Sequence, residues 1–121
     1  MKLHEQRTAH MNLIGRYGPG EVLINGRSHS VPLLVAPGHL RTDWISEISE
    51  LGADALTLVW ELQPRIVLLG ADARDPARIK PLRGIFADRQ IALESMDLGA
   101  ACRTYNVLAQ EDRAVVALLF P

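Results

Sequence analysis

The stretch MDLGAACRTYNVLAQEDR, residues 96–113, predicts a helix that starts after Asp97 and leads into a buried strand. Asp97 is a good N-cap because its carboxylate can accept from free amides of the first helical turn. Apolar side chains at helical spacing form one face of the helix: Leu98, Ala101, Cys102, Tyr105, Leu108 and Ala109. Residues 114–120, AVVALLF, then run apolar without alternation, as in a strand buried on both faces. The stretch therefore predicts an α/β sheet protein.

Residues 65–120 alternate between buried strands and amphipathic helices. A short apolar strand at 66–69 ends at Gly70, and residues 91–96 form the next extended segment. Between them a helical stripe is formed by Ile79, Leu82, Ile85 and Phe86. Pro81 must then lie in the first turn of this helix, or the helix kinks there. The order β-α-β-α-β predicts a largely parallel sheet with right-handed crossovers.

The first half of the chain predicts antiparallel strands. Asn25-Gly26 lies between extended segments at 21–24 and 27–31, and it supplies the two positive φ angles of a tight type I′ hairpin turn. Other strands are expected at 12–17 and 31–35, where Pro32 indicates a strand start or an edge. Residues 39–52 fit a helix and a strand equally well, whereas 53–62 have helical spacing and end before Pro64. We expect a flexible tail at 1–11 and a single domain at 12–121, in which the N-terminal hairpins add antiparallel strands or a second small sheet.

Composition and charge narrow the class of protein. The chain has 121 residues, 48% of them hydrophobic, which is enough for one domain with a real core. A net charge of -1 gives no global field that attracts nucleic acid, so no nucleic-acid partner is expected. One cysteine cannot form an internal disulfide, and no apolar run approaches the roughly 20 residues that span a bilayer. Residues 1–12 also lack a signal-peptide core. We expect a cytoplasmic protein without direct membrane insertion, as a monomer or weak homodimer.

No pattern in the sequence indicates catalysis. Cys102 would be a nucleophile if a helix N-terminus lowered its pKa, but its place in the second turn, on the apolar face, favours a small buried hydrophobe. The histidines are scattered without ligand spacing: His4, His10, His29 and His39. There is no nucleophile elbow, P-loop or dinucleotide-binding glycine motif. We therefore predict no catalytic residue, no cofactor and no metal site.

Polar side chains gather where a binding surface would use them. Asp72 follows the strand at 66–69 and Asp97 follows the strand at 91–96, so their loops lie together if those strands are neighbours. Asp72 and Asp97 could also serve only as turn or helix-cap residues. Each polar residue of the helix after Asp97 could, taken alone, be an ordinary solvent-exposed residue. Their density still favours a functional surface. The candidate binding surface is Asp72, Asp97, Arg103, Thr104, Asn106 and Glu111.

Residues 94–108, ESMDLGAACRTYNVL, together with Glu111-Asp112-Arg113, resemble a small domain family of unknown function. That family includes mitochondrial complex I assembly factor 3 and the adipogenesis-associated Mth-domain protein, and the resemblance covers residues 12–121. It implies a three-layer α/β fold with a central mixed, mostly parallel sheet, helices and an additional N-terminal antiparallel β layer. It also implies an extended segment ending at 44–48 and a helix at 53–62. Where the family has Gly-Thr-Gly, this chain has Gly70-Ala71-Asp72 and lacks the second glycine.

Three functions compete. The first is a non-enzymatic protein-binding domain whose partners, by the resemblance, are proteins of respiratory complex assembly. The second is a small-ligand-binding protein or enzyme with a site at the carboxyl ends of the strands. This hypothesis predicts a pocket that joins Asp72, Asp97 and Arg103, with Cys102 as a further candidate. The third is a scaffold in which the run at 94–113 serves packing alone. The resemblance implies no catalytic residues, and fold-level analogy does not transfer function by itself.

Overall fold

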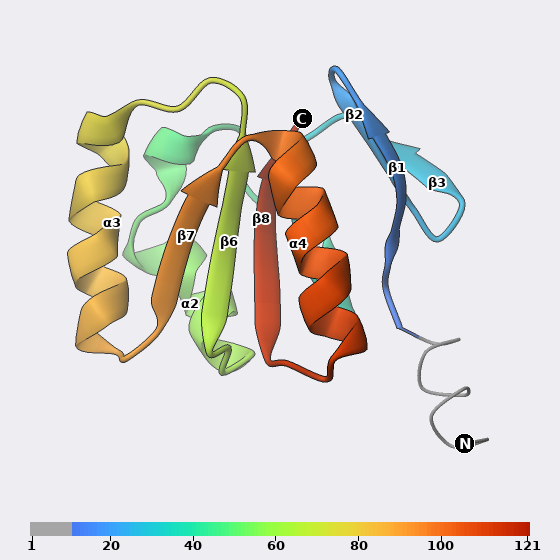
Figure 1. Cartoon of the computed structure of the whole chain (residues 1–121). Helices are drawn as coiled ribbons and strands as arrows, with labels where there is room; N and C mark the ends of the chain where they lie inside the picture. The colour runs from blue at the N-terminus through green and yellow to red at the C-terminus, as the bar shows by residue number, and fades with distance from the viewer. Residues whose placement is uncertain (1–10) are drawn as a thin grey trace.

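A computed structural model describes residues 11–121 (Figure 1). The predicted tail lies outside the described residues except for Met11, which is partly buried and packs against the core. The described chain contains eight strands, three α-helices and one short 3-10 helix.

The centre of the molecule is a five-stranded mixed sheet with the order β5-β4-β8-β6-β7. Strands β6 (Ile66–Ala71), β7 (Ala92–Met96) and β8 (Val115–Phe120) pair in parallel, with β6 in the middle. Strands β4 (Leu33–Ala36) and β5 (His39–Arg41) extend the sheet with antiparallel pairings beyond β8. The β-α-β-α-β order predicted for 65–120 is thus confirmed, and its strands form the parallel half of the sheet.

Both faces of this sheet are covered, which gives three layers (Figure 1). Helices α2 (Ala53–Glu61) and α3 (Pro76–Asp88) pack on one face through Leu56, Val59, Leu82 and Phe86. Helix α4 (Leu98–Gln110) and a second, three-stranded sheet cover the other face. The three-layer α/β fold with an additional N-terminal antiparallel layer is therefore confirmed.

The second sheet consists of β1 (Ile14–Gly18), β2 (Glu21–Ile24) and β3 (Arg27–His29), paired antiparallel in that order. Asn25 and Gly26 have φ angles of 51° and 81°, as a type I′ turn requires, which confirms the predicted hairpin. Ile14, Val22 and Ile24 point into the core that this sheet shares with α4.

Helix α4 has both ends fixed by the local sequence. The Asp97 carboxylate accepts from the Ala100 amide at 2.7 Å, so the predicted N-cap is confirmed. At the other end Asp112 has a φ of 60°, and the amide of Arg113 donates to Leu108 at 3.0 Å. These two features form a Schellman motif, which satisfies carbonyls that the helix leaves free.

Helix α3 excludes one of the two alternatives that the sequence left for Pro81. Asp75 caps the helix and Pro76 occupies its first position, so Pro81 lies in the second turn and not in the first. Pro81 is exposed and removes one amide from the helical hydrogen-bond ladder. Apolar packing of Leu82 and Phe86 on the sheet outweighs this loss. Among residues 11–121, no helix combines the length and the apolar character that a membrane span requires.

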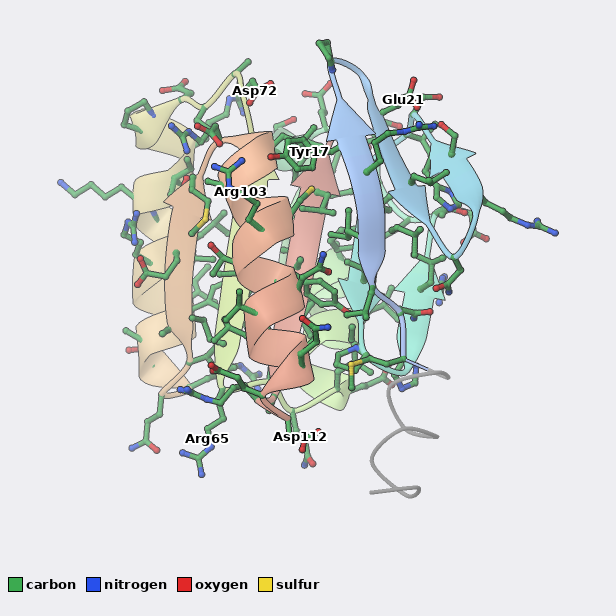
Figure 2. All side chains as sticks on the ribbon, turned by 45° about the vertical axis from the view of Figure 1, so that its right-hand side comes forward. Tyr17, Glu21, Arg65, Asp72, Arg103 and Asp112 are labelled. Carbon is green, nitrogen blue, oxygen red and sulfur yellow. The ribbon has the colours of Figure 1, made fainter. Side chains whose placement is uncertain are left out.

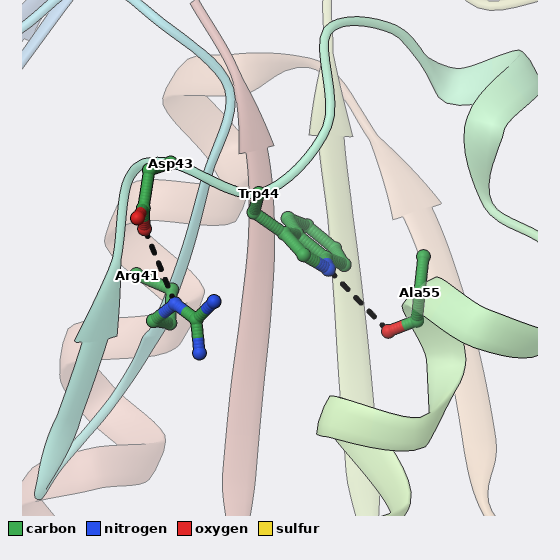
Figure 3. A network of polar contacts seen from close by, with 4 residues as sticks. All are labelled: Arg41, Asp43, Trp44 and Ala55. Carbon is green, nitrogen blue, oxygen red and sulfur yellow. Dashed lines mark hydrogen bonds and ion pairs between the residues drawn. The ribbon is translucent and has the colours of Figure 1, made fainter.

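Residues 39–52, which fit a helix and a strand equally well in the sequence, are mostly irregular. This segment, for which helix and strand were both left open, begins with β5, a short edge strand, and continues without regular structure to a 3-10 helix, η1 (Ile48–Glu50). Trp44 fixes this segment, because its indole Nε1 donates to the Ala55 carbonyl of α2 at 3.4 Å (Figure 3). Arg41 and Asp43 form an exposed ion pair beside it at 3.2 Å. Tertiary anchoring, and not local periodicity, decides the path of these residues.

Gly70 permits the close approach of α4 to the central strand. A Cβ atom at this position would lie 2.4 Å from the Ala101 Cβ and 3.0 Å from Leu119 Cδ2. Gly70 and Ala101 are therefore a matched pair of small residues at the crossing of β6 and α4. This contact determines where the N-terminus of α4, and with it the candidate surface, lies.

Candidate binding surface

The loops after β6 and β7 lie side by side, as expected for neighbouring parallel strands. The Asp72 carboxylate accepts from the Leu98 amide at 3.0 Å, across a sequence separation of 26 residues. The Asp97 carboxylate accepts from Ala100, in the same first turn of α4. The structure therefore brings Asp72 and Asp97 together at one helix end.

These two carboxylates satisfy the Leu98 and Ala100 amides, which are two of the groups with which a helix N-terminus would bind a phosphate. An anionic ligand at this point would have to displace Asp72 and would meet the charge of Asp97. Asp72 stands at the third position of the family's Gly-Thr-Gly, and its side chain bridges two loops. The N-terminus of α4 is thus a structural junction whose two carboxylates disfavour an anionic ligand.

Removing either carboxylate should weaken the helix measurably. We expect Asp97→Ala and Asp72→Ala each to lower the free energy of unfolding by about 1 kcal/mol, because each leaves a first-turn amide without its acceptor. Urea denaturation followed by circular dichroism measures the effect. Asp54→Ala, an exposed substitution in the first turn of α2, is the control and should change stability by less than about 0.5 kcal/mol. Wild-type stability in Asp72→Ala would contradict the bridge.

Tyr17 and Arg103 form the most distinctive contact of the exposed surface. The Tyr17 hydroxyl is hydrogen-bonded by the Arg103 guanidinium, whose Cζ lies 5.8 Å from the centre of the Tyr17 ring. Figure 2 shows the two side chains meeting from β1 and α4, near Asp72 at the same end of the molecule. Tyr17 also lies over Gly99, where a Cβ would come within 2.7 Å of the ring.

Sequence reasoning missed Tyr17 as a member of the surface. The pattern places it only at the end of a strand, although an exposed tyrosine beside a turn is a common binding residue. Its side chain remains 38% exposed, although it touches both Gly99 and Arg103. The contact with Arg103 spans 86 positions, so no local pattern indicates it.

Asn106 joins the two layers and is not a free surface residue. Its side chain accepts from the Ile14 amide at 2.9 Å and donates to the Ile14 carbonyl at 2.7 Å. The hydroxyl of its buried neighbour Tyr105 donates to the Asn12 carbonyl at 2.7 Å. Together these bonds attach β1 to α4. Thr104 is partly buried on the same helix.

The six predicted residues therefore do not form one site. Asp72, Asp97 and Arg103 lie toward the N-terminal end of α4, whereas Glu111 is the C-cap at its far end, with Arg113 at 4.0 Å. We define the α4–β1 surface as Tyr17, Asp72, Asp97 and Arg103. Asn106 supports this surface from within the layer contact.

An open groove lies beside this surface at the carboxyl ends of β6 and β8. It has a volume of about 650 Å³ and is bordered by Ala71, Asp72 and Phe120 from the strand ends. Ser46, Glu47 and Ser49 close its other side. The small-ligand hypothesis requires a pocket that joins Asp72 with Asp97, Arg103 and Cys102. This groove does not join them, because Asp72 is the only one of the four that lines it.

Cys102 is a buried core residue. Its side chain is 1% exposed, and burial raises the pKa of the thiol from 9.0 to about 11, while the nearby Arg103 charge lowers it in part. Burial also raises the pKa of the Tyr105 hydroxyl well above its ordinary value. Neither group is poised for nucleophilic or acid–base chemistry near neutral pH. Among residues 11–121, no cluster of histidine, cysteine and carboxylate side chains is arranged to hold a metal ion.

The buried thiol leads to a prediction about pH. Because the folded pKa exceeds the unfolded value, the folded state holds this proton more tightly, and the stability from Cys102 is complete below about pH 9 and lost as pH rises toward about 11. We expect Ellman's reagent at pH 8 to modify Cys102 only after unfolding, and urea midpoints to fall between pH 8 and pH 10.5. Rapid labelling of the native protein would contradict the burial, and Cys102→Ala should flatten part of the pH dependence.

Fold and surface together define a small three-layer α/β domain with an exposed Tyr–Arg pair beside an open groove. The chain belongs to the protein family of unknown function DUF498/DUF598, whose sequence profile matches residues 14–120. This membership confirms the resemblance found in residues 94–113.

Relatives and solved structures extend this assignment. The human NADH dehydrogenase [ubiquinone] 1 alpha subcomplex assembly factor 3 is 29% identical over all of this chain and 67% of its own length. The zebrafish (Danio rerio) protein of the same name is 31% identical, over 90% of this chain and 64% of its own length. The chain thus spans about two thirds of these relatives. The crystal structure of an outer membrane protein from Bartonella henselae is 31% identical, with a TM-score of 0.72 over 91% of this chain and 94% of that one.

Proposed function

We propose that this protein is a non-enzymatic protein-binding domain that acts as an accessory factor in the assembly of a respiratory complex. The observation that carries the proposal is the match of the whole chain to an assembly factor of NADH dehydrogenase. An assembly factor holds its client through surface complementarity and needs no catalytic group. We place this activity in the cytoplasm, because the single cysteine, Cys102, leaves the chain without the internal disulfides typical of an oxidising compartment.

The α4–β1 surface is the contact region in this proposal. Tyrosine and arginine are enriched among the residues that dominate binding energy, because they combine a large apolar area with directional hydrogen bonding. The hydrogen bond between Arg103 and Tyr17 already restricts both side chains. A partner that binds them therefore causes little further loss of side-chain entropy. Asp72 and Asp97 add negative charge at the rim, which favours a partner with a basic residue opposite.

Co-purification from the native cells under mild crosslinking tests the proposal. We expect the tagged protein to recover subunits or assembly proteins of NADH dehydrogenase, and Tyr17→Ala and Arg103→Ala to reduce their yield at least about tenfold. Arg113→Ala is the matched control, because Arg113 is equally basic and 61% exposed but lies beyond the far end of α4. Equal recovery from Arg103→Ala and Arg113→Ala, with both folded, would contradict the assignment of the surface. A large loss of stability in Arg103→Ala without loss of recovery would support a pure packing role.

A small-ligand site is the second candidate, favoured by the groove at the strand ends. Its volume suits a small molecule, and its place outside the carboxyl ends of parallel strands is the usual one in α/β proteins. A fragment screen by NMR should then shift the amides of Ala71 and Phe120, and Ser30→Trp should abolish the shifts by filling the groove. Arg27→Trp, on exposed β3, is the control. Absence of shifts at both amides would remove this candidate.

A further inference from the structure

Strand β7 ends the central sheet and has one unpaired edge. The Ala92 amide donates to the Arg65 carbonyl beside β6, so Ala92 and Glu94 present their backbone groups to β6. Because successive residues of a strand alternate, Leu93 and Ser95 point their backbone groups to the open edge. One of these groups is covered, since Arg83 Nη1 of α3 donates to the Leu93 carbonyl at 2.8 Å.

A groove of about 400 Å³ lies between Ser95, near the carboxyl end of β7, and α3. Three of its six lining residues are cations, Arg74, Lys80 and Arg83, and the others are Pro76, Ile79 and Ser95. No carboxylate lines the groove, and within residues 11–121 none of the three cations forms an ion pair. The nearby carboxylates Asp75 and Asp72 are engaged elsewhere, because Asp75 caps α3 and faces Arg78 at 3.9 Å, and Asp72 accepts from the Leu98 amide of α4. Glu94 belongs to the opposite face of the sheet, since Ser95 faces the groove.

A groove lined by three cations and no carboxylate contrasts with the net charge of -1 of the whole chain. A short edge strand with unpaired backbone groups is a template for another strand, and cations beside it select against other cationic edges. A second copy of this chain paired along β7 would place the two sets of three cations together, so like-charge repulsion disfavours that dimer. An acidic strand at the same edge would instead be attracted by the three cations.

We propose that the β7 edge binds an extended acidic segment of a partner protein by strand addition. The segment pairs its backbone with Ser95 and with the Leu93 amide. Its alternate side chains, spaced along one face of the strand, place carboxylates against Arg74 and Lys80. When the segment binds, the Arg83 guanidinium leaves the Leu93 carbonyl and pairs with a carboxylate of the segment. The Leu93 carbonyl is then free to accept a hydrogen bond from the added strand, so the edge becomes available only to an acidic ligand. This surface lies apart from the α4–β1 surface and does not depend on the function proposed for it.

Peptide titration with the full chain tests the proposal. The probe is a short, N-acetylated, fluorescein-labelled peptide of alternating Glu and Val, and its controls are the same peptide with Lys for Glu and the same peptide with methylated backbone nitrogens. We expect saturable binding of the acidic peptide alone, weakened by added salt. We also expect slower hydrogen exchange at the Ser95 amide on binding, which reports a strand at the edge. Arg74→Glu with Lys80→Glu should weaken binding about tenfold or more, from two surface charges reversed.

Control variants and control peptides distinguish the effect of charge from the effects of strand pairing and of misfolding. Arg65→Glu, at the opposite end of the sheet (Figure 2), should bind the acidic peptide like wild type. The Arg74 and Lys80 side chains are exposed, so the double variant is expected to fold normally. Equal binding of the methylated peptide, equal binding by the double variant, no binding of the acidic peptide, or tighter binding of an oligothymidylate would each overturn the proposal.

Discussion

Gly70→Ala is expected to lower the free energy of unfolding by about 3 kcal/mol, because the site has no room for the added methyl group. The added Cβ would lie 2.4 Å from the Ala101 Cβ, and neither atom belongs to a flexible side chain. Relief requires α4 to move away from β6, which loosens the contacts of Leu98, Cys102 and Tyr105 with the sheet. Urea denaturation measures the loss.

Two further variants make this test specific. Gly84 lies exposed in α3, and a Cβ added there would have no atom within 4 Å, so Gly84→Ala should stabilise the protein by about 1 kcal/mol through helix propensity. Ala101→Gly should rescue part of the loss in Gly70→Ala, because it removes the atom that clashes. If Gly70→Ala is as stable as wild type, the close contact of α4 with β6 is wrong.

Asn106→Ala is expected to destabilise the protein by about 2–3 kcal/mol, because it leaves the amide and the carbonyl of Ile14 without partners at the layer contact. Besides lowering the stability of the whole domain, the substitution should loosen the small sheet more than the central sheet. Amides of β1 and β2 should exchange faster with solvent than those of β6 and β8, since Asn106 attaches the small sheet to α4.

The matched control for this variant is its neighbour on the helix. Val107 is 54% exposed, and Val107→Ala should change stability by less than about 0.5 kcal/mol. Hydrogen exchange followed by NMR distinguishes the two positions. Uniform exchange across both sheets in Asn106→Ala would contradict its role as the link between layers.

Local chemistry explains which elements were predictable. The cap at Asp97, the apolar face of α4 and the Asn25-Gly26 turn each depend on residues within one or two turns of each other, and all three are found as expected. The unbroken apolar run of β8 requires burial on both faces, and the structure buries Val115 on one face of the sheet and Val116 on the other. The parallel core could therefore be deduced without the structure.

Long-range contacts explain what could not be deduced. Strand β5 is three residues long and gains its hydrogen bonds from β4, so its own sequence carries no strand pattern. Pro81 is tolerated beyond the first turn because the packing of α3 on the sheet compensates for it. Asn106 has the spacing of an exposed helix residue, yet its partner Ile14 lies 92 positions away.

The dense run that indicated function consists largely of packing residues. Ala101 meets Gly70, Gly99 meets Tyr17, Asn106 meets Ile14, and the two aspartates hold the helix end. Arg103 is different, because it is exposed and its contact with Tyr17 leaves both side chains accessible to a partner. This separation of packing from exposure is why the proposed function depends on Tyr17 and Arg103.

Site-directed photocrosslinking tests that function most directly. A benzoylphenylalanine replaces Tyr17 in one protein and Arg65, at the opposite end of the molecule, in another (Figure 2). Both are expressed in the native cells and irradiated. We predict that the probe at position 17 crosslinks to a protein of NADH dehydrogenase or of its assembly, and that the probe at position 65 does not. The same crosslinks from both positions, or none of these proteins from position 17, would contradict a protein-binding role for the α4–β1 surface.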